Sequence, residues 1–152
     1  MTLCTYVQGV FLWRVLQVRI VKLSRKYADT YGKLPETMHK SERPYYCLEI
    51  KVESRTFAIP LRHHIRHKYC FHTLGEAGID YSKAIPILDA SMVSDEPARI
   101  DTAEWNILRK NEDEIFIGFN KYLRLYRKAV SMKHIPRYKS IVSMSALQYF
   151  EI

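Results

Sequence analysis

The segment PLRHHIRHKYCFHT, at residues 60–73, gathers the side chains with the clearest chemistry in this sequence. It contains four of the six histidines and three cationic side chains: His63, His64, His67, His72, Arg62, Arg66 and Lys68. Imidazoles transfer protons near neutral pH, and guanidinium and ammonium groups stabilise phosphate charge. The segment has no acidic residue. Its residue types are compatible with a metal site, a site for phosphate chemistry or a solvated basic edge.

A zinc site is the first of these alternatives. His63 and His67 are spaced i,i+4, and Cys70 and His72 follow closely. That spacing brings ligands together only on a helix, whereas this segment follows a predicted strand and Pro60. Its three cations would also repel a divalent ion. We therefore expect no metal ion here.

Motifs for common cofactors and nucleophiles are absent from the sequence. It has no GxxxxGK[ST] loop, no GxGxxG fingerprint and no GxSxG elbow. The acidic residues of the loops, Asp80, Asp89, Asp95 and Glu96, lack the spacing of a two-metal site. We expect no cofactor.

Metal-free cleavage of RNA fits the residue types that remain. RNA supplies its own nucleophile, the 2′-hydroxyl, so the protein has to supply a base, an acid and cations for the phosphorane charge. The net charge of +8 and the pI near 9.4 favour an anionic partner. Because a surface that only binds nucleic acid has the same composition, that alternative stays open.

Side chains elsewhere in the sequence are candidates for further RNA contacts. Tyrosines beside basic residues could stack on bases or pack on the surface: Tyr27, Tyr31, Tyr45 and Tyr81. Lys121, Arg124 and Lys128 share one face of a predicted helix, which is either a phosphate-binding face or a solvated one.

The predicted elements place strands before helices. Strand patterns occur at residues 18–23, 45–53, 55–61 and 69–73. Gly32 and Pro35 indicate a loop with a helical turn at 35–40, and the apolar segment 83–91 is expected to be buried.

The C-terminal half is predicted to be helical. Asp101 and Glu104 form a capping box, and Ile100 and Trp105 are spaced as a hydrophobic staple. A second helix, expected from Asn111, has an apolar stripe: Ile115, Phe119, Tyr122, Leu123, Tyr126 and Val130. This order of elements predicts an α+β domain with a strongly twisted, mostly antiparallel sheet flanked by helices.

Cysteine spacing and hydropathy indicate the compartment. Cys4, Cys47 and Cys70 are widely spaced and form no disulfide framework, which suits a reducing environment. The apolar N-terminus has a charge-free run of only 13 residues before Arg14, too short to span a bilayer, and it lacks the features of a signal peptide. We expect a soluble cytoplasmic protein with no membrane partner.

From about residue 18 to the C-terminus, the chain resembles the ToxN/AbiQ family, the endoribonuclease toxins of type III toxin–antitoxin systems. It is most similar to the TenpN-like branch. The motifs that carry the resemblance are LSRKY (23–27), FAIPLR (57–62) followed by IRHK, GIDYSKA (78–84), VSDEP (93–97) and the terminal SALQYFEI. Their order and spacing together are more specific than any one of them.

The resemblance implies a sheet related to the compact barrel of MazF-type toxins and metal-independent cleavage that leaves a 2′,3′-cyclic phosphate. It implies two RNA partners, cellular mRNA and an antitoxin RNA of tandem repeats that fold as pseudoknots. The toxin cuts the antitoxin from its precursor and forms a closed hetero-oligomer with it.

The resemblance also assigns catalytic positions. Its S-x-K-Y element matches Ser24 to Tyr27, where the tyrosine belongs to the active-site groove, and a basic residue before the next strand matches Arg43. Arg62, Arg66 and His67 match positions of the TenpN-like motif, whereas His63 and His64 depart from it. The pocket hydroxyls of ToxN are missing from this sequence. We expect His67 or His63 to transfer protons.

The remaining cations and aromatic groups near these motifs are expected to contact RNA. The charge-stabilising set is Arg43, Arg62, Arg66 and Lys68, and the RNA-binding set is Arg25, Lys26, Tyr31, His64, Tyr81, Lys83, Lys121, Arg124 and Lys128.

Residues 1–17 precede the part of the chain that resembles the family, whose members begin at the first strand. We therefore expect 1–17 to be an N-terminal extension and 18–152 to be the toxin domain. The rival hypothesis is an additional hydrophobic element that packs on the sheet.

Overall fold

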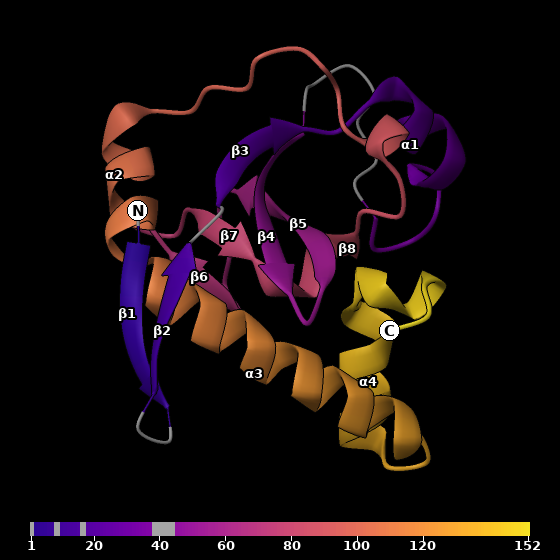
Figure 1. Ribbon diagram of the computed structural model, residues 1–152. Helices are drawn as coiled ribbons and strands as arrows, with labels where there is room; N and C mark the ends of the chain where they lie inside the picture. Colours follow the sequence, from indigo (N-terminus) through magenta and orange to yellow (C-terminus); the bar gives the residue numbers. More distant parts are fainter. Residues whose placement is uncertain (1, 8–9, 16–17, 38–44) are drawn as a thin grey trace.

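The computed structural model describes residues 2–7, 10–15, 18–37 and 45–152, with side chains from residue 18 onward (Figure 1). The strands are β1 (Thr2–Val7), β2 (Val10–Val15), β3 (Arg19–Lys22), β4 (Tyr46–Val52), β5 (Arg55–Arg62), β6 (Cys70–His72), β7 (Gly78–Asp80) and β8 (Ile85–Pro86). The α-helices are α1 (Arg25–Tyr31), α2 (Thr102–Lys110), α3 (Glu112–Ser131) and α4 (Pro136–Met144). Three 3₁₀ helices are η1 (Tyr81–Lys83), η2 (Ala90–Met92) and η3 (Ala146–Tyr149).

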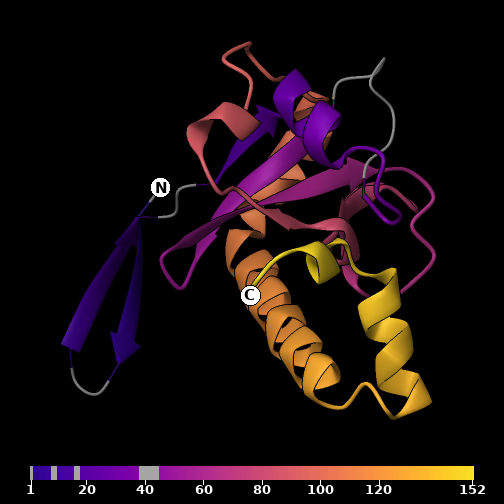
Figure 2. The same cartoon turned by 90° about the vertical axis from the view of Figure 1, so that its right-hand side faces the viewer.

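Six of the strands form one sheet in the order β3-β4-β5-β7-β6, with β8 paired to β5. Its ladders are antiparallel, which confirms the predicted α+β class and mostly antiparallel sheet. In the described part of the chain this strand order does not close on itself, so the sheet is not the barrel that the resemblance implied. β1 and β2 form a separate two-stranded sheet, which projects from the rest in Figure 2.

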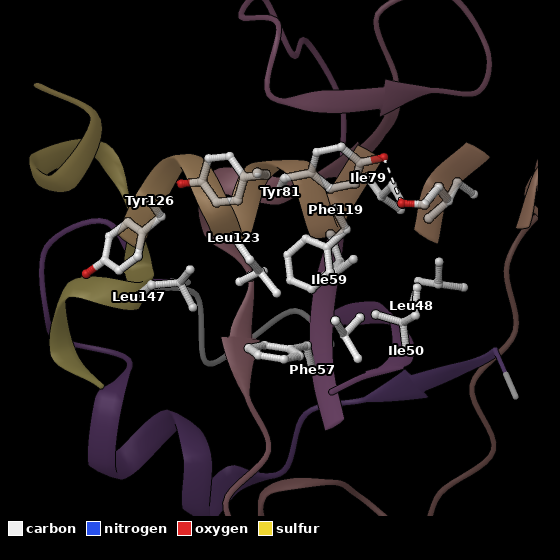
Figure 3. Packing of buried hydrophobic residues seen from close by; sticks show 14 of the residues in the cluster. Leu48, Ile50, Phe57, Ile59, Ile79, Tyr81, Phe119, Leu123, Tyr126 and Leu147 are labelled. Carbon is white, nitrogen blue, oxygen red and sulfur yellow. Dashed lines mark hydrogen bonds between the residues drawn. The ribbon is translucent and has the colours of Figure 1, made fainter. Parts of the chain in front are cut away.

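Side-chain alternation along β4 and β5 divides the apolar residues between the two faces of the sheet. Leu48, Ile50, Phe57 and Ile59 point towards α3 and pack with Phe119 in the main core (Figure 3). The other face carries a second cluster with α1 and η2: Val21, Leu23, Tyr27, Cys47, Ala58, Ile85, Met92 and Ala146. Apolar side chains are therefore buried on both faces of these two strands, although Lys51 of β4 is exposed.

The start of α2 follows the predicted capping pattern in part. The Asp101 carboxylate accepts hydrogen bonds from backbone N–H groups in the first turn of α2. The Glu104 carboxylate accepts a hydrogen bond from the Thr73 hydroxyl at 2.7 Å, which ties α2 to the turn after β6. Ile100 and Trp105 both pack against the main core.

Three other sequence expectations need correction. Val130 is 39% exposed, while the other five residues of the α3 stripe are buried. Two helices were not predicted: α1, capped by the Ser24 hydroxyl, and α4, which begins at Pro136. The expected helical turn at 35–40 lies partly outside the described residues, and 35–37 form turns.

Candidate functional site

Pairing of β5 with β7 brings the start of the histidine-rich segment beside an aspartate. Leu61 is opposite Ile79 and Arg62 is opposite Gly78, so Arg62 and Asp80 are diagonal neighbours on one face of the sheet. Leu61 and Ile79 point to the main core, which places Arg62 and Asp80 on the face away from α3.

The Asp80 carboxylate is the centre of a hydrogen-bonded cluster. Its Oδ2 accepts from Arg62 Nη1 at 2.7 Å, and its Oδ1 accepts from the Ser82 N–H at 3.0 Å and the Ser82 hydroxyl at 2.6 Å. His67 Nε2 lies 3.2 Å from the same Oδ1. Asp80 has no exposed side-chain surface, whereas 46% of the Arg62 side chain and 26% of the His67 side chain are exposed. We call Arg62, His67, Asp80 and Ser82 the Asp80 cluster.

Hydrogen bonds to both ring nitrogens fix the tautomer of His67. Nδ1 lies 3.1 Å from the backbone N–H of Tyr69, which can only donate. The proton of the neutral ring is therefore on Nε2, which lies 3.4 Å from the Ser82 hydroxyl and 3.2 Å from Asp80 Oδ1. Because neither nitrogen has a free lone pair in this arrangement, His67 positions the loop and the carboxylate and is not poised as a base.

The neighbouring imidazoles are in a different environment. Ile65 is buried and its N–H donates to the Glu76 carbonyl at 2.9 Å, which anchors the middle of the loop. His64 and Arg66 flank it at 3.4 Å and 3.8 Å from the Glu76 carboxylate, each with 79% of its side chain exposed. His63 is exposed and has no hydrogen-bond partner among the described residues. Its ring is free to exchange a proton with a ligand.

Lys68 and Tyr69 connect this loop to α3. The Lys68 ammonium lies 5.6 Å from the centre of the Tyr69 ring, and that ring is 5.6 Å from the ring of Tyr122. The Tyr122 hydroxyl donates to the Ser145 hydroxyl at 2.9 Å, and burial raises the pKa of the phenol. Tyr122 is therefore a neutral packing group, whereas Lys68 is exposed.

Two tyrosines that the sequence placed near RNA are in the core. Tyr27 is 1% exposed and packs with the cluster under α1. Tyr81 is 5% exposed, packs against Phe119, and its hydroxyl donates to the Ile115 carbonyl at 3.4 Å. Both rings bury apolar area on folding and are inaccessible in this structure, contrary to a role in contacting RNA.

The remaining predicted residues are dispersed. Arg25 is exposed on α1, and Lys26 donates to the Ser91 hydroxyl at 2.7 Å. Lys83 is mostly buried, where it pairs with Glu36 and donates to the Met144 carbonyl at 2.9 Å. The aromatic rings of Tyr31 and Tyr45 are half-buried beside the second cluster. Lys121, Arg124 and Lys128 are exposed on α3, and Arg43 lies outside the described residues.

Sequence reasoning missed the anchor of the site. It considered Asp80 only as a metal ligand and did not identify Ser82. The D-x-S spacing at 80–82 is typical of a turn in which the aspartate accepts from the N–H two residues later, and this signal could have identified both. Its proximity to Arg62 required knowledge of the strand pairing.

Metal ligation and membrane insertion have no support in the described residues. They include no group of three His, Cys, Asp or Glu side chains placed to hold a metal ion. Nor do they include a helix with the length and apolar character to cross a bilayer.

Comparison of the chain with family models, curated proteins and solved structures gave no match.

Proposed function

We propose that the protein is a metal-independent endoribonuclease, the toxin of a type III toxin–antitoxin system. The observation that supports this proposal is the Asp80 cluster, in which a buried carboxylate binds the half-exposed Arg62. The next residue, His63, has an exposed imidazole. Its substrates are mRNA and the precursor of its own tandem-repeat antitoxin RNA, which inhibits it in a closed complex. The sheet, in this proposal, is an open relative of the MazF-type barrel.

The proposed reaction needs only the RNA and side chains of this segment. The 2′-hydroxyl loses its proton to a base and attacks the adjacent phosphorus; the P–O5′ bond breaks and the 5′-oxygen takes a proton from an acid, leaving a 2′,3′-cyclic phosphate. His63 is the proposed base because its ring has no partner in the described residues. Arg62 stabilises the phosphorane charge, and His64 and Lys68 are candidates for the acid.

Analysis of product ends tests this proposal. Purified protein is incubated with RNA in EDTA, and the new termini are identified by mass spectrometry. We expect 2′,3′-cyclic phosphate and 5′-hydroxyl ends. Cleavage that stops in EDTA would show a metal-dependent enzyme, and the absence of cleavage under any condition would show an RNA-binding regulator. That second candidate is favoured by one observation, the engagement of both His67 nitrogens.

Two substitutions separate the roles of the imidazoles. His63→Gln should lower the cleavage rate by roughly 10²-fold or more without changing the urea midpoint, because it removes an unpartnered base. His67→Gln should lower both the cleavage rate and the urea midpoint, since it removes a contact to Asp80. His72→Gln, an exposed histidine outside the proposed roles, is the control. Equal activity of His63→Gln and wild type would remove His63 from the mechanism.

A further inference from the structure

The last quarter of the chain carries an excess of positive charge. Between Glu114 and Glu151 the sequence has no acidic residue and seven lysines and arginines. This region forms most of α3, the following turn and α4, which lie side by side in both views of the fold (Figures 1 and 2). Six of its cations are exposed, and the five that lie on the two helices define what we call the α3–α4 basic surface: Lys121, Arg124, Lys128, Arg137 and Lys139.

Tyr138 holds two of these cations next to each other. Lys128 Nζ, from α3, lies 5.6 Å from the centre of the Tyr138 ring, and the Arg137 guanidinium, from α4, lies 4.7 Å from it. Arg137 Nη2 also donates to the Tyr138 hydroxyl at 2.8 Å. Hydrogen bonding from Lys128 and then from Arg137 lowers the pKa of this phenol.

Neither of these two cations is neutralised by a carboxylate in the described residues. The ion pairs on α3 include Arg127, which contacts Glu53 at 3.0 Å, but not Lys128. Two unpaired charges held beside one phenol repel each other, and an anion placed between them would relieve that repulsion. The surface is therefore suited to a phosphate group.

Packing of Tyr69 connects the α3–α4 basic surface to the Asp80 cluster. Tyr69 follows His67 by two residues and packs against the small cluster of Ala129, Tyr138 and Ile141 between α3 and α4. Lys68 lies over the Tyr69 ring. Cations thus continue from Arg62 and Arg66 through Lys68 to the two helices.

The distribution of apolar side chains favours RNA over a lipid surface. A helix that binds in a membrane interface presents an apolar face to the lipid. The apolar face of α3, with Phe119, Leu123 and Tyr126, is buried in the core. α3 and α4 also expose three large apolar side chains, Ile117, Val130 and Met144, but the five exposed cations of the two helices outnumber them, which suits a polyanion in water.

We propose that the α3–α4 basic surface binds the phosphate backbone of an RNA chain whose scissile bond lies at the Asp80 cluster. This inference deepens the proposed function and rests on it for the identity of the polyanion. RNA that leaves the cleavage site passes Lys68 and continues over Lys128 and Arg137. These contacts position the RNA without reading its sequence, so they serve mRNA and antitoxin RNA alike.

Binding of a non-cleavable RNA tests the inference. The full-length chain is titrated with a 2′-O-methyl RNA of about 20 nucleotides, long enough to extend beyond one site, at several salt concentrations. Lys128→Gln/Arg137→Gln should weaken binding about tenfold and reduce the slope of log affinity against log salt by roughly 1.4, about 0.7 for each lost phosphate contact. Lys121→Gln/Arg124→Gln, which alters exposed side chains only, should act in the same direction.

A matched control separates a located surface from general charge. Lys51→Gln/Arg99→Gln removes one exposed lysine and one exposed arginine from β4 and from the loop before α2, and it should leave the affinity unchanged. Equal weakening by control and test variants, or wild-type affinity of both test variants, would overturn the inference. So would unchanged RNA binding combined with weakened binding to phosphatidylserine vesicles. Because this RNA cannot be cut, the binding assay does not depend on cleavage. A failure to cleave RNA would reject the proposed enzyme activity and leave the binding surface untouched.

Discussion

At the residue scale, the candidate site depends on a charge that solvent does not reach. The Asp80 carboxylate has no exposed side-chain surface, and its partners are Arg62, Ser82 and His67. A buried carboxylate is tolerated only when donors replace the water it loses. The cluster consequently fixes Arg62 and His67, while His63, which has no donor or acceptor from the described residues, stays available for a ligand.

Removal of the Asp80 charge should destabilise the domain. Asp80→Asn keeps the size of the side chain but replaces one acceptor oxygen by an NH2 group, which faces the donors of Arg62 or Ser82. Arg62 also loses its carboxylate partner. We expect a loss of about 3 kcal/mol in the free energy of unfolding, the lower end for a broken buried pair because Arg62 is half-exposed. Urea denaturation measures it. Asp95→Asn, at an exposed loop position, is the control and should match wild type.

The thiol of Cys70 reports on the same charge. Burial, and then the negative charge of Asp80, raises the pKa of Cys70. A raised pKa means less thiolate at a given pH, so alkylation by iodoacetamide should be slow near neutrality and should accelerate only at higher pH. In a Cys4→Ser background, Asp80→Asn should move this acceleration to lower pH.

The control for the thiol experiment is Ser82→Ala, which loosens the cluster but retains the carboxylate. If both variants shift the pH profile of Cys70 alkylation equally, increased exposure and not charge is the cause. Mass spectrometry of the peptide containing Cys70 distinguishes it from Cys47, whose thiol is fully buried.

The sequence could predict those parts of the site whose residues are close together along the chain, but not those that depend on strand pairing. Arg62, Arg66 and His67 lie within six residues, and residue types alone indicated that this segment is basic and rich in histidine. Asp80 lies 18 residues after Arg62, and only the β5–β7 ladder makes them neighbours. The burial of Tyr27 was equally hidden, because a tyrosine beside basic residues has the same sequence pattern in a groove and in a core.

At the element scale, local signals predicted four strands, β3 to β6, and missed the other four described strands and the helices α1 and α4. Alternation in 45–53 and 55–61 corresponds closely to β4 and β5. α1 has only seven residues, too few for a hydrophobic period, and its signal was the Ser24 cap. α4 has weak amphipathicity, and its signal was proline in the first turn.

The turn between β4 and β5 stores conformational strain that one substitution should release. Glu53 and Ser54 connect the paired residues Val52 and Arg55, and both have positive φ, 52° and 65°. Such two-residue turns favour glycine at the second position. Ser54→Gly should raise the free energy of unfolding by about 0.5–1 kcal/mol, measured in urea. Ser54→Ala retains the strained φ, so a gain of the same size in that variant would contradict the explanation.

At the scale of the whole molecule, the described side chains form one domain from Val18 onward. Apolar clusters cover both faces of the six-stranded sheet, and the α3–α4 pair adds a third cluster. The α3–α4 basic surface and the Asp80 cluster belong to this domain. β1 and β2 pair only with each other among the described ladders.

This arrangement predicts that residues 18–152 fold and function without the N-terminal hairpin. β3 begins at Arg19 and takes its only ladder from β4 in the described chain, so removal of 1–17 breaks no pairing of the main sheet. The truncated chain should match the full chain in urea midpoint, m-value and RNA cleavage, because a hairpin that pairs only with itself adds no surface to the cooperative unfolding of the domain. A loss of more than about 1 kcal/mol, a typical single-contact effect, would instead show that the hairpin packs on the domain as an integral hydrophobic element.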